Sequence, residues 1–239
     1  MEDKLDIKLK RLRGGFILDV AAGRGDSLKY LVDTMSGFEY ALGVDYSLKN
    51  ITEAAGKFND DRIELALMDA ARLGLPDGCF DTVTMVNSLH HLADPKAALA
   101  EMKRVLKPGG LLMVCEMRND VSSDEKMTHV LMHHWWAEID RLDNIDHYPT
   151  FSGQQLEAMT HSLALDNPET IPLITDPELP ENNPGYDALE KICRDYLARI
   201  GTRADSDRLI REGNQILERI KQIGLCWADR LCFMGHKPN

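Results

Sequence analysis

The sequence predicts an α/β fold: a doubly wound, mostly parallel sheet of seven strands, interrupted by helical insertions. Two observations lead to this prediction. From residue 16 to about 114, short apolar runs alternate with patterns of helical spacing, which implies parallel strands covered by helices on both faces. After Glu116 the alternation breaks, and long helical stretches precede the last two strand-like runs.

Seven apolar runs have the length and composition of buried strands. They are FILDVA (16–21), YALGVDYS (40–47), RIELALMDA (62–70), CFDTVTMVNS (79–88), GGLLMVCEM (109–117), ETIPLIT (169–175) and RLCFMGHKP (230–238). Helical spacing is predicted for 27–35, 47–58, 95–106, 121–142 and 152–165, and for two helices within 187–223. The stretch 176–185 is rich in turn-forming residues.

These elements suggest an order of domains along the chain. It comprises an N-terminal helix or arm (1–13), a ligand-binding core (14–116), a helical insertion (117–150), a core helix and strand (151–175), a second helical insertion (176–223) and a closing strand (224–239). Ligands of open α/β sheets bind beyond the carboxyl ends of the strands. We therefore expect the two insertions to form a lid over a pocket at that edge.

Composition narrows the classes of function. The formal net charge of −11 argues against nucleic acid as the main substrate. No apolar run is long enough to span a bilayer, and the first residues lack a signal-peptide core, so we expect a cytoplasmic protein. The five cysteines show no CxxC spacing, and we expect reduced, mostly buried thiols. A homodimer is compatible with the sequence, which carries no signal of oligomeric state.

The loop after the first predicted strand, DVAAGRGD (19–26), is built for close approach to a ligand. Gly23 and Gly25 let the backbone turn tightly. The loop lacks the Lys-Ser/Thr of a phosphate-binding P-loop and matches the dinucleotide fingerprint poorly. Acids end three successive predicted strands, at Asp19, Asp45 and Asp69. An acid after the second strand can bind both ribose hydroxyls, and the set suits a nucleoside with a positive tail, such as a sulfonium.

The segments ILDVAAGRG, GVDYS, MDAARLGLPDGCFDTVTMVNSLHHLADP and RVLKPGGLLMV resemble, in order and spacing, the motifs of class I S-adenosylmethionine (SAM)-dependent methyltransferases. The nearest subgroup includes quinone-biosynthesis and other small-molecule enzymes. The resemblance spans residues 14 to 116 and implies a Rossmann-like methyltransferase fold, SAM as cofactor and a small-molecule acceptor. Nucleic acid and membrane are not expected partners.

The same resemblance implies a role for individual residues. Asp19, Ala21 and Gly23 would follow the methionine moiety, and Gly25 would close the turn. Asp45 would bind the ribose. The remaining residues implied near the cofactor are Tyr46 packing on the adenine, Asp69 and Ala70 reading its edge, Asn87 near the amino group, and His91 near the methyl-transfer site.

The stretch from Thr128 to Pro149 is rich in histidine and tryptophan. At helical spacing, one narrow face carries His129, His133, Trp136, Asp140 and Asp143. An apolar stripe, including Trp135, lies beside this face. The histidine face allows three interpretations: a divalent metal site formed by His129, His133 and Asp140, a general base that orients a polar acceptor, or a structural role.

The sequence therefore predicts a methyltransferase that moves a methyl group from SAM to a small molecule, with His91, His129 and His133 as candidates for the catalytic base. The alternatives are a metal-assisted methyltransferase that uses the histidine face and a non-catalytic protein that binds or senses SAM. A dinucleotide-dependent oxidoreductase is a more distant alternative, because the glycine loop matches that fingerprint poorly.

Overall fold

The computed structural model describes residues 4–175, 184–202 and 205–239. The chain forms two compact units, each with its own hydrophobic core. The first unit comprises Met1–Glu116, Gln154–Leu173 and Leu231–Asn239, and the second comprises Met117–Gly153 and Ile174–Arg230. The predicted turn-rich stretch falls largely on 176–183, outside the described residues, as do residues 1–3 of the predicted arm.

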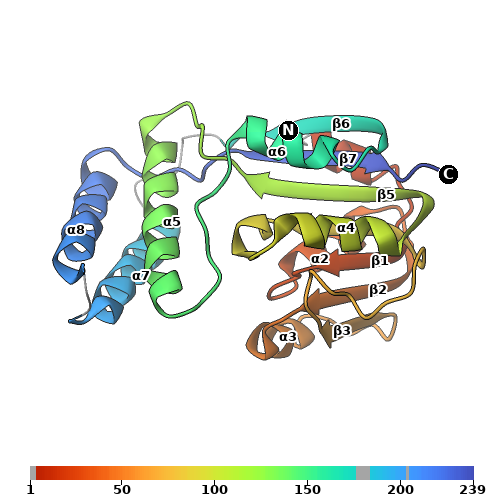
Figure 1. Ribbon diagram of the computed structural model, residues 1–239, viewed down its shortest axis with the longest axis horizontal. Helices are drawn as coiled ribbons and strands as arrows, with labels where there is room; N and C mark the ends of the chain where they lie inside the picture. The colour runs from red at the N-terminus through yellow and green to blue at the C-terminus, as the bar shows by residue number, and fades with distance from the viewer. Residues whose placement is uncertain (1–3, 176–183, 203–204) are drawn as a thin grey trace. The chain divides into compact units, whose positions relative to one another are not determined.

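A seven-stranded sheet forms the frame of the first unit, in the order β3-β2-β1-β4-β5-β7-β6 (Figure 1). Strands β1 to β5 pair in parallel. All seven predicted strands form, and the prediction of a doubly wound, mostly parallel sheet is confirmed. Their bounds are Gly15–Val20 (β1), Phe38–Asp45 (β2), Ile63–Leu67 (β3), Phe80–Val86 (β4), Leu106–Met117 (β5), Asp166–Leu173 (β6) and Arg230–His236 (β7).

The last strand runs against its neighbour β5. The amide of Gly109 donates to the carbonyl of Lys237 (2.8 Å), and the amide of Lys237 donates to the carbonyl of Gly110 (3.0 Å). The start of β5 therefore lies beside the end of β7, the pattern of an antiparallel pair. In the same register, Cys115 stands opposite Cys232.

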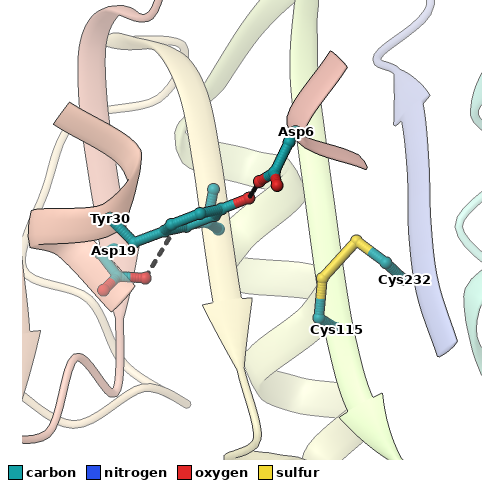
Figure 2. Close-up of a disulfide and its surroundings, with 6 residues drawn as sticks. Asp6, Asp19, Tyr30, Cys115 and Cys232 are labelled. Carbon is teal, nitrogen blue, oxygen red and sulfur yellow. Dashed lines mark hydrogen bonds between the residues drawn. A yellow bond between two sulfur atoms is a disulfide. The ribbon is translucent and has the colours of Figure 1, made fainter. Parts of the chain in front are cut away.

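Cys115 and Cys232 form a disulfide across this pair of strands (Figure 2). The expectation that all five thiols are reduced is therefore wrong for these two. They are 117 residues apart in sequence and become neighbours only through the antiparallel pairing of β5 and β7. The other three cysteines, Cys79, Cys193 and Cys226, carry free thiols, and the last two are buried.

Helices pack on both faces of the sheet. In the first unit they are α1 (Lys4–Leu9), α2 (Asp26–Thr34), α3 (Leu48–Ala55), α4 (Pro95–Val105) and α6 (Gly153–His161). Leu9 of α1 and Leu28 of α2 pack with Met113 of β5 in one core cluster. The side chains of Leu112 and Val114 alternate to the opposite face, where they are also buried. Tyr30 of α2 donates its hydroxyl to Asp6 of α1 and ties these helices together (Figure 2).

The described residues of the second unit form three long helices, α5 (Asp124–Leu142), α7 (Pro184–Ile200) and α8 (Ser206–Gln222). They pack side by side, in contact with one another (Figure 1). Trp135 and Ile139 of α5, Cys193 of α7 and Leu217 of α8 share one core. None of the described helices combines the length and apolar character that a membrane span needs.

A buried ion pair connects distant chain segments within the second unit. Lys126 of α5 bonds to Asp229 (Nζ–Oδ1 2.6 Å), and both side chains are almost fully buried. The same carboxylate oxygen accepts the amide of Thr175 (3.1 Å), and the carbonyl of Asp229 accepts the amide of Arg118 (2.9 Å). Asp229 thus connects residues 118–126 and Thr175 to the segment just before β7.

Candidate functional site

The loop between β1 and α2 adopts a backbone that suits ligand binding. Gly23 has a φ of +56°, and a Cβ added to it would meet no atom within 4 Å. The absent side chain therefore leaves open space at the loop, which a ligand can approach closely. Gly25 has a packing role instead, because a Cβ there would lie 2.9 Å from the ring of Phe58.

Ala21 adopts a left-handed backbone with a φ of +53°. That conformation is unfavourable for a residue with a Cβ and persists only where neighbouring groups enforce it. Ser88, which follows β4, donates its hydroxyl to the carbonyl of Ala21 (3.2 Å). The loop after β4 thus supports the glycine loop at a strained position.

Asp19 is the residue before the last of β1 and is fully buried. Its carboxyl accepts hydrogen bonds from the hydroxyls of Thr84 (2.7 Å) and Ser27. Burial raises the pKa of Asp19 to about 6, against the lowering effect of these two bonds, and the charge of Asp45 adds to the rise. The first unit therefore holds a carboxyl whose charge is costly unless a cation binds beside it.

Asp45 ends β2 and is turned toward the glycine loop. Its Oδ2 accepts the amide of Gly23 (2.9 Å), while its Oδ1 accepts the amide of Ser47 (2.9 Å) and the side-chain amide of Asn50 (3.2 Å). A carboxylate offers about four acceptor positions, so this one retains capacity for a hydroxyl donor while it holds the loop in place. This is the arrangement expected of a ribose-binding acid.

The third acid, Asp69, follows β3 and is exposed. Its Oδ1 accepts the amide of Ala71 (2.9 Å), which shapes the turn, and Ala70 beside it is buried. Tyr46 follows β2 with 61% of its surface exposed, as a residue that packs on a ligand would be. Since β1, β2 and β3 are parallel neighbours, these residues follow the same ends of adjacent strands.

Asn87 follows β4 with a φ of +50°, and its amide donates to the carbonyl of Cys115 (2.8 Å). The next residues form the 3-10 turn η1 (Leu89–His91). Glu116, at the end of β5, holds this turn: Oε2 accepts the amide of Leu89 (2.7 Å), and Oε1 lies 2.9 Å from Nδ1 of His90. Sequence reasoning did not separate Glu116 from ordinary polar residues, because only the pairing of β4 with β5 brings it to the turn.

The predicted histidine face of α5 lies within the second unit and is largely buried. His129 accepts the amide of Ala228 at Nδ1 (3.1 Å). The rings of His129 and His133 lie 6.0 Å apart, and Trp136 stacks on Tyr196 of α7. The indole nitrogen of Trp136 is buried and interacts with the thiol of Cys193 on α7.

Asp140 has partners other than the predicted metal-binding ones. Its Oδ2 accepts from Tyr196 (2.8 Å) and from Nδ1 of His147 (2.7 Å), and its Oδ1 pairs with Arg199 (2.8 Å). Burial alone would raise the pKa of Asp140, but these bonds outweigh it and lower the pKa below its usual value. Nε2 of His147 in turn lies 3.2 Å from Nδ1 of His133.

The described part of the second unit thus contains a series Asp140–His147–His133 rather than a gathering of His129, His133 and Asp140 around one point. Sequence periodicity found His133 and Asp140 on α5, but not His147. That residue follows the helix and returns to it through a loop whose path the sequence does not show.

Comparison with known proteins finds a family match within the first unit. A family model described as a methyltransferase domain matches residues 18–114. This part of the chain is a methyltransferase domain. The match contains the glycine loop, all three acids and the β4 turn, and it confirms the resemblance stated from the sequence motifs.

Curated relatives match less than half of this chain. The demethylmenaquinone methyltransferase of Renibacterium salmoninarum is 41% identical over 103 residues, which are 43% of this chain and 41% of that protein. The enzyme of the same name from Thermus thermophilus is 38% identical over 102 residues, 42% of this chain and 46% of that one. The chain therefore spans less than half the length of these relatives.

A solved structure shows the same fold over the chain. Phosphoethanolamine N-methyltransferase 2 of Haemonchus contortus, solved with SAM, has a TM-score of 0.59 and 17% identity, over 98% of this chain and 52% of that one. At this identity the likeness concerns the fold, and the acceptor specificity of such folds resides in their sites.

Proposed function

We propose that this chain transfers a methyl group from SAM to a small-molecule acceptor. The observation that carries the proposal is the site at the end of β1 and β2, where an open glycine loop is held by Asp45 and a buried acid with a raised pKa lies beneath it. When bound, SAM supplies an activated methyl group, and the protein must bind, orient and shield the reactants.

The residues present fit this cofactor. We propose that Asp45 binds the ribose hydroxyls and that Asp19 balances the positive charge of the methionine end, along Ala21 and Gly23. Gly25 closes the turn. The adenine would lie between Tyr46 and the turn of Asp69 and Ala70, and Asn87 would lie near the amino group.

His133 is the candidate base that the hydrogen bonds support best, ahead of His91 and His129. Nδ1 of His147 lies 2.7 Å from Oδ2 of Asp140, and its Nε2 lies 3.2 Å from Nδ1 of His133. Asp140 and His147 would therefore orient the ring of His133. The helices of the second unit would supply the acceptor contacts, since the family model ends at residue 114 and does not cover them.

A metal-assisted reaction through His129, His133 and Asp140 finds less support, because three donors occupy the carboxylate of Asp140. The alternative function, binding of SAM without transfer of its methyl group, predicts the same behaviour of the cofactor site. A turnover assay distinguishes this alternative from an enzyme.

The test combines binding with transfer. Calorimetric titration with SAM should give saturable binding that Asp45→Ala weakens at least tenfold, in line with the loss of charge-assisted hydrogen bonds. Asp33→Asn, a change at an exposed acid of the same unit, is the matched control and should bind as the wild type does.

Label from the methyl group of SAM should then pass into the small-molecule fraction of a deproteinised cell extract. His133→Gln and His147→Asn should slow that transfer while SAM affinity is unchanged. Absence of SAM binding in the wild-type protein would refute the proposal. Binding without any transfer would favour the sensing protein.

A further inference from the structure

The turn after β4 is held by a carboxylate that lies outside the set of residues implied to touch SAM. Glu116 is completely buried, and it contacts Nδ1 of His90. His90 is itself almost completely buried. The second oxygen of Glu116 accepts the amide of Leu89. A buried carboxylate stays in place only when hydrogen bonds satisfy it, so both bonds fix the turn to the end of β5.

Hydrogen bonds from Ser88 connect this turn to the glycine loop. Ser88, between Asn87 and the turn, shares its one hydroxyl proton between the carbonyls of Ala21 (3.2 Å) and Val86 (2.9 Å). Both Ala21 and Asn87 have left-handed backbones although neither is glycine. Two strained residues at the ends of neighbouring strands need surrounding contacts to hold them, and strain of this kind gathers at ligand sites.

We propose that Glu116 is a positioning residue for the SAM site. It acts through the Leu89–His91 turn and Ser88 on the glycine loop, and it keeps Ala21 and Asn87 in the backbone conformation that binds the cofactor. This inference rests on the proposed function, because it assigns a second layer of residues to the same cofactor site.

The chain offers a matched control for this role. Thr82, near the opposite end of β4, donates its buried hydroxyl to the carbonyl of Gly14 (2.9 Å). Thr82→Val removes a buried hydrogen bond from the same strand without touching the turn. It therefore measures the effect of lost stability alone on SAM binding.

The experiment is calorimetric titration of each folded variant with SAM, alongside thermal unfolding. Glu116→Ala should weaken SAM binding by about tenfold, the lower end of the range for residues that orient the ligands of metal sites. Glu116→Gln keeps an oxygen for the amide of Leu89 and should lose less. Thr82→Val should unfold at a lower temperature and bind SAM as the wild type does.

A second variant keeps the test decisive if Glu116→Ala does not fold. Ser88→Ala removes only the hydroxyl that reaches Ala21 and should also weaken SAM binding. Wild-type affinity in Ser88→Ala, or in a folded Glu116→Ala, would overturn the positioning role while the proposed function stands. Failure of the wild-type protein to bind SAM would instead refute the proposed function.

Discussion

Replacing Asp19 by asparagine should stabilise the ligand-free protein and weaken its binding of SAM. Burial raises the pKa of this carboxyl from 3.8 to about 6. A raised pKa means that the folded state binds the proton more tightly than the unfolded state does. The ionised carboxyl therefore opposes folding, and this cost develops as the pH rises from about 4 to about 6.

The magnitude follows from the size of the shift. About 2 pKa units at 1.36 kcal/mol each correspond to about 3 kcal/mol above pH 6. Asparagine has nearly the same shape and no charge, and the hydroxyls of Ser27 and Thr84 can rotate to meet its amide. At 2–4 °C per kcal/mol for a domain of this size, Asp19→Asn should raise the melting temperature by roughly 6–12 °C at pH 7.5.

Scanning calorimetry of both proteins at pH 5 and pH 7.5 measures the effect. All three tryptophans belong to the second unit, so a transition without a change in tryptophan fluorescence reports the first unit, where Asp19 lies. About half of the gain should be present at pH 5, since the wild-type carboxyl is then mostly protonated. A lower melting temperature at pH 7.5, or a gain independent of pH, would refute the reasoning.

Three further perturbations have expected outcomes. Lys126→Met should lower the free energy of unfolding of the second unit by about 3–5 kcal/mol, because Asp229 is left buried without its partner. Urea titration followed by tryptophan fluorescence measures this change. Lys29→Met, at an exposed position, is the control. Gly213→Ala should destabilise the same unit by roughly 1–3 kcal/mol, because the new Cβ would lie 2.4 Å from the ring of Trp135. Thiol titration of the denatured, unreduced protein should count three thiols of the five cysteines, and a count of five would contradict the disulfide.

The sheet could be predicted from the sequence because its strands are local apolar runs. Residues 17–20, for example, are buried on a central strand, and no other element competes for that pattern. The three acids were found for the same reason: each follows a run whose end the sequence marks. No local sequence pattern indicates that β7 lies between β5 and β6 in the sheet. The disulfide depends on that placement, so it could not be predicted either.

Side-chain partners of the second unit were beyond the sequence for a related reason. Helical spacing places His133 and Asp140 on one face of α5 correctly, but it cannot show that Tyr196, Arg199 and His147 reach Asp140. Those contacts span up to 59 positions along the chain and depend on how α7 packs. The helix face alone therefore left a metal site, a general base and a structural role open, whereas its neighbours supply a hydrogen-bonded series.

Two buried carboxyls of the first unit should respond to substitution in opposite ways. The charge of Asp19 is costly to the ligand-free fold, so its loss should raise stability while it lowers SAM affinity. Glu116 accepts two hydrogen bonds that hold a turn, so its loss should lower both stability and affinity. General weakening of the fold cannot produce opposite changes in stability. The pair of substitutions therefore distinguishes a residue that contacts the cofactor from one that positions the loop around it.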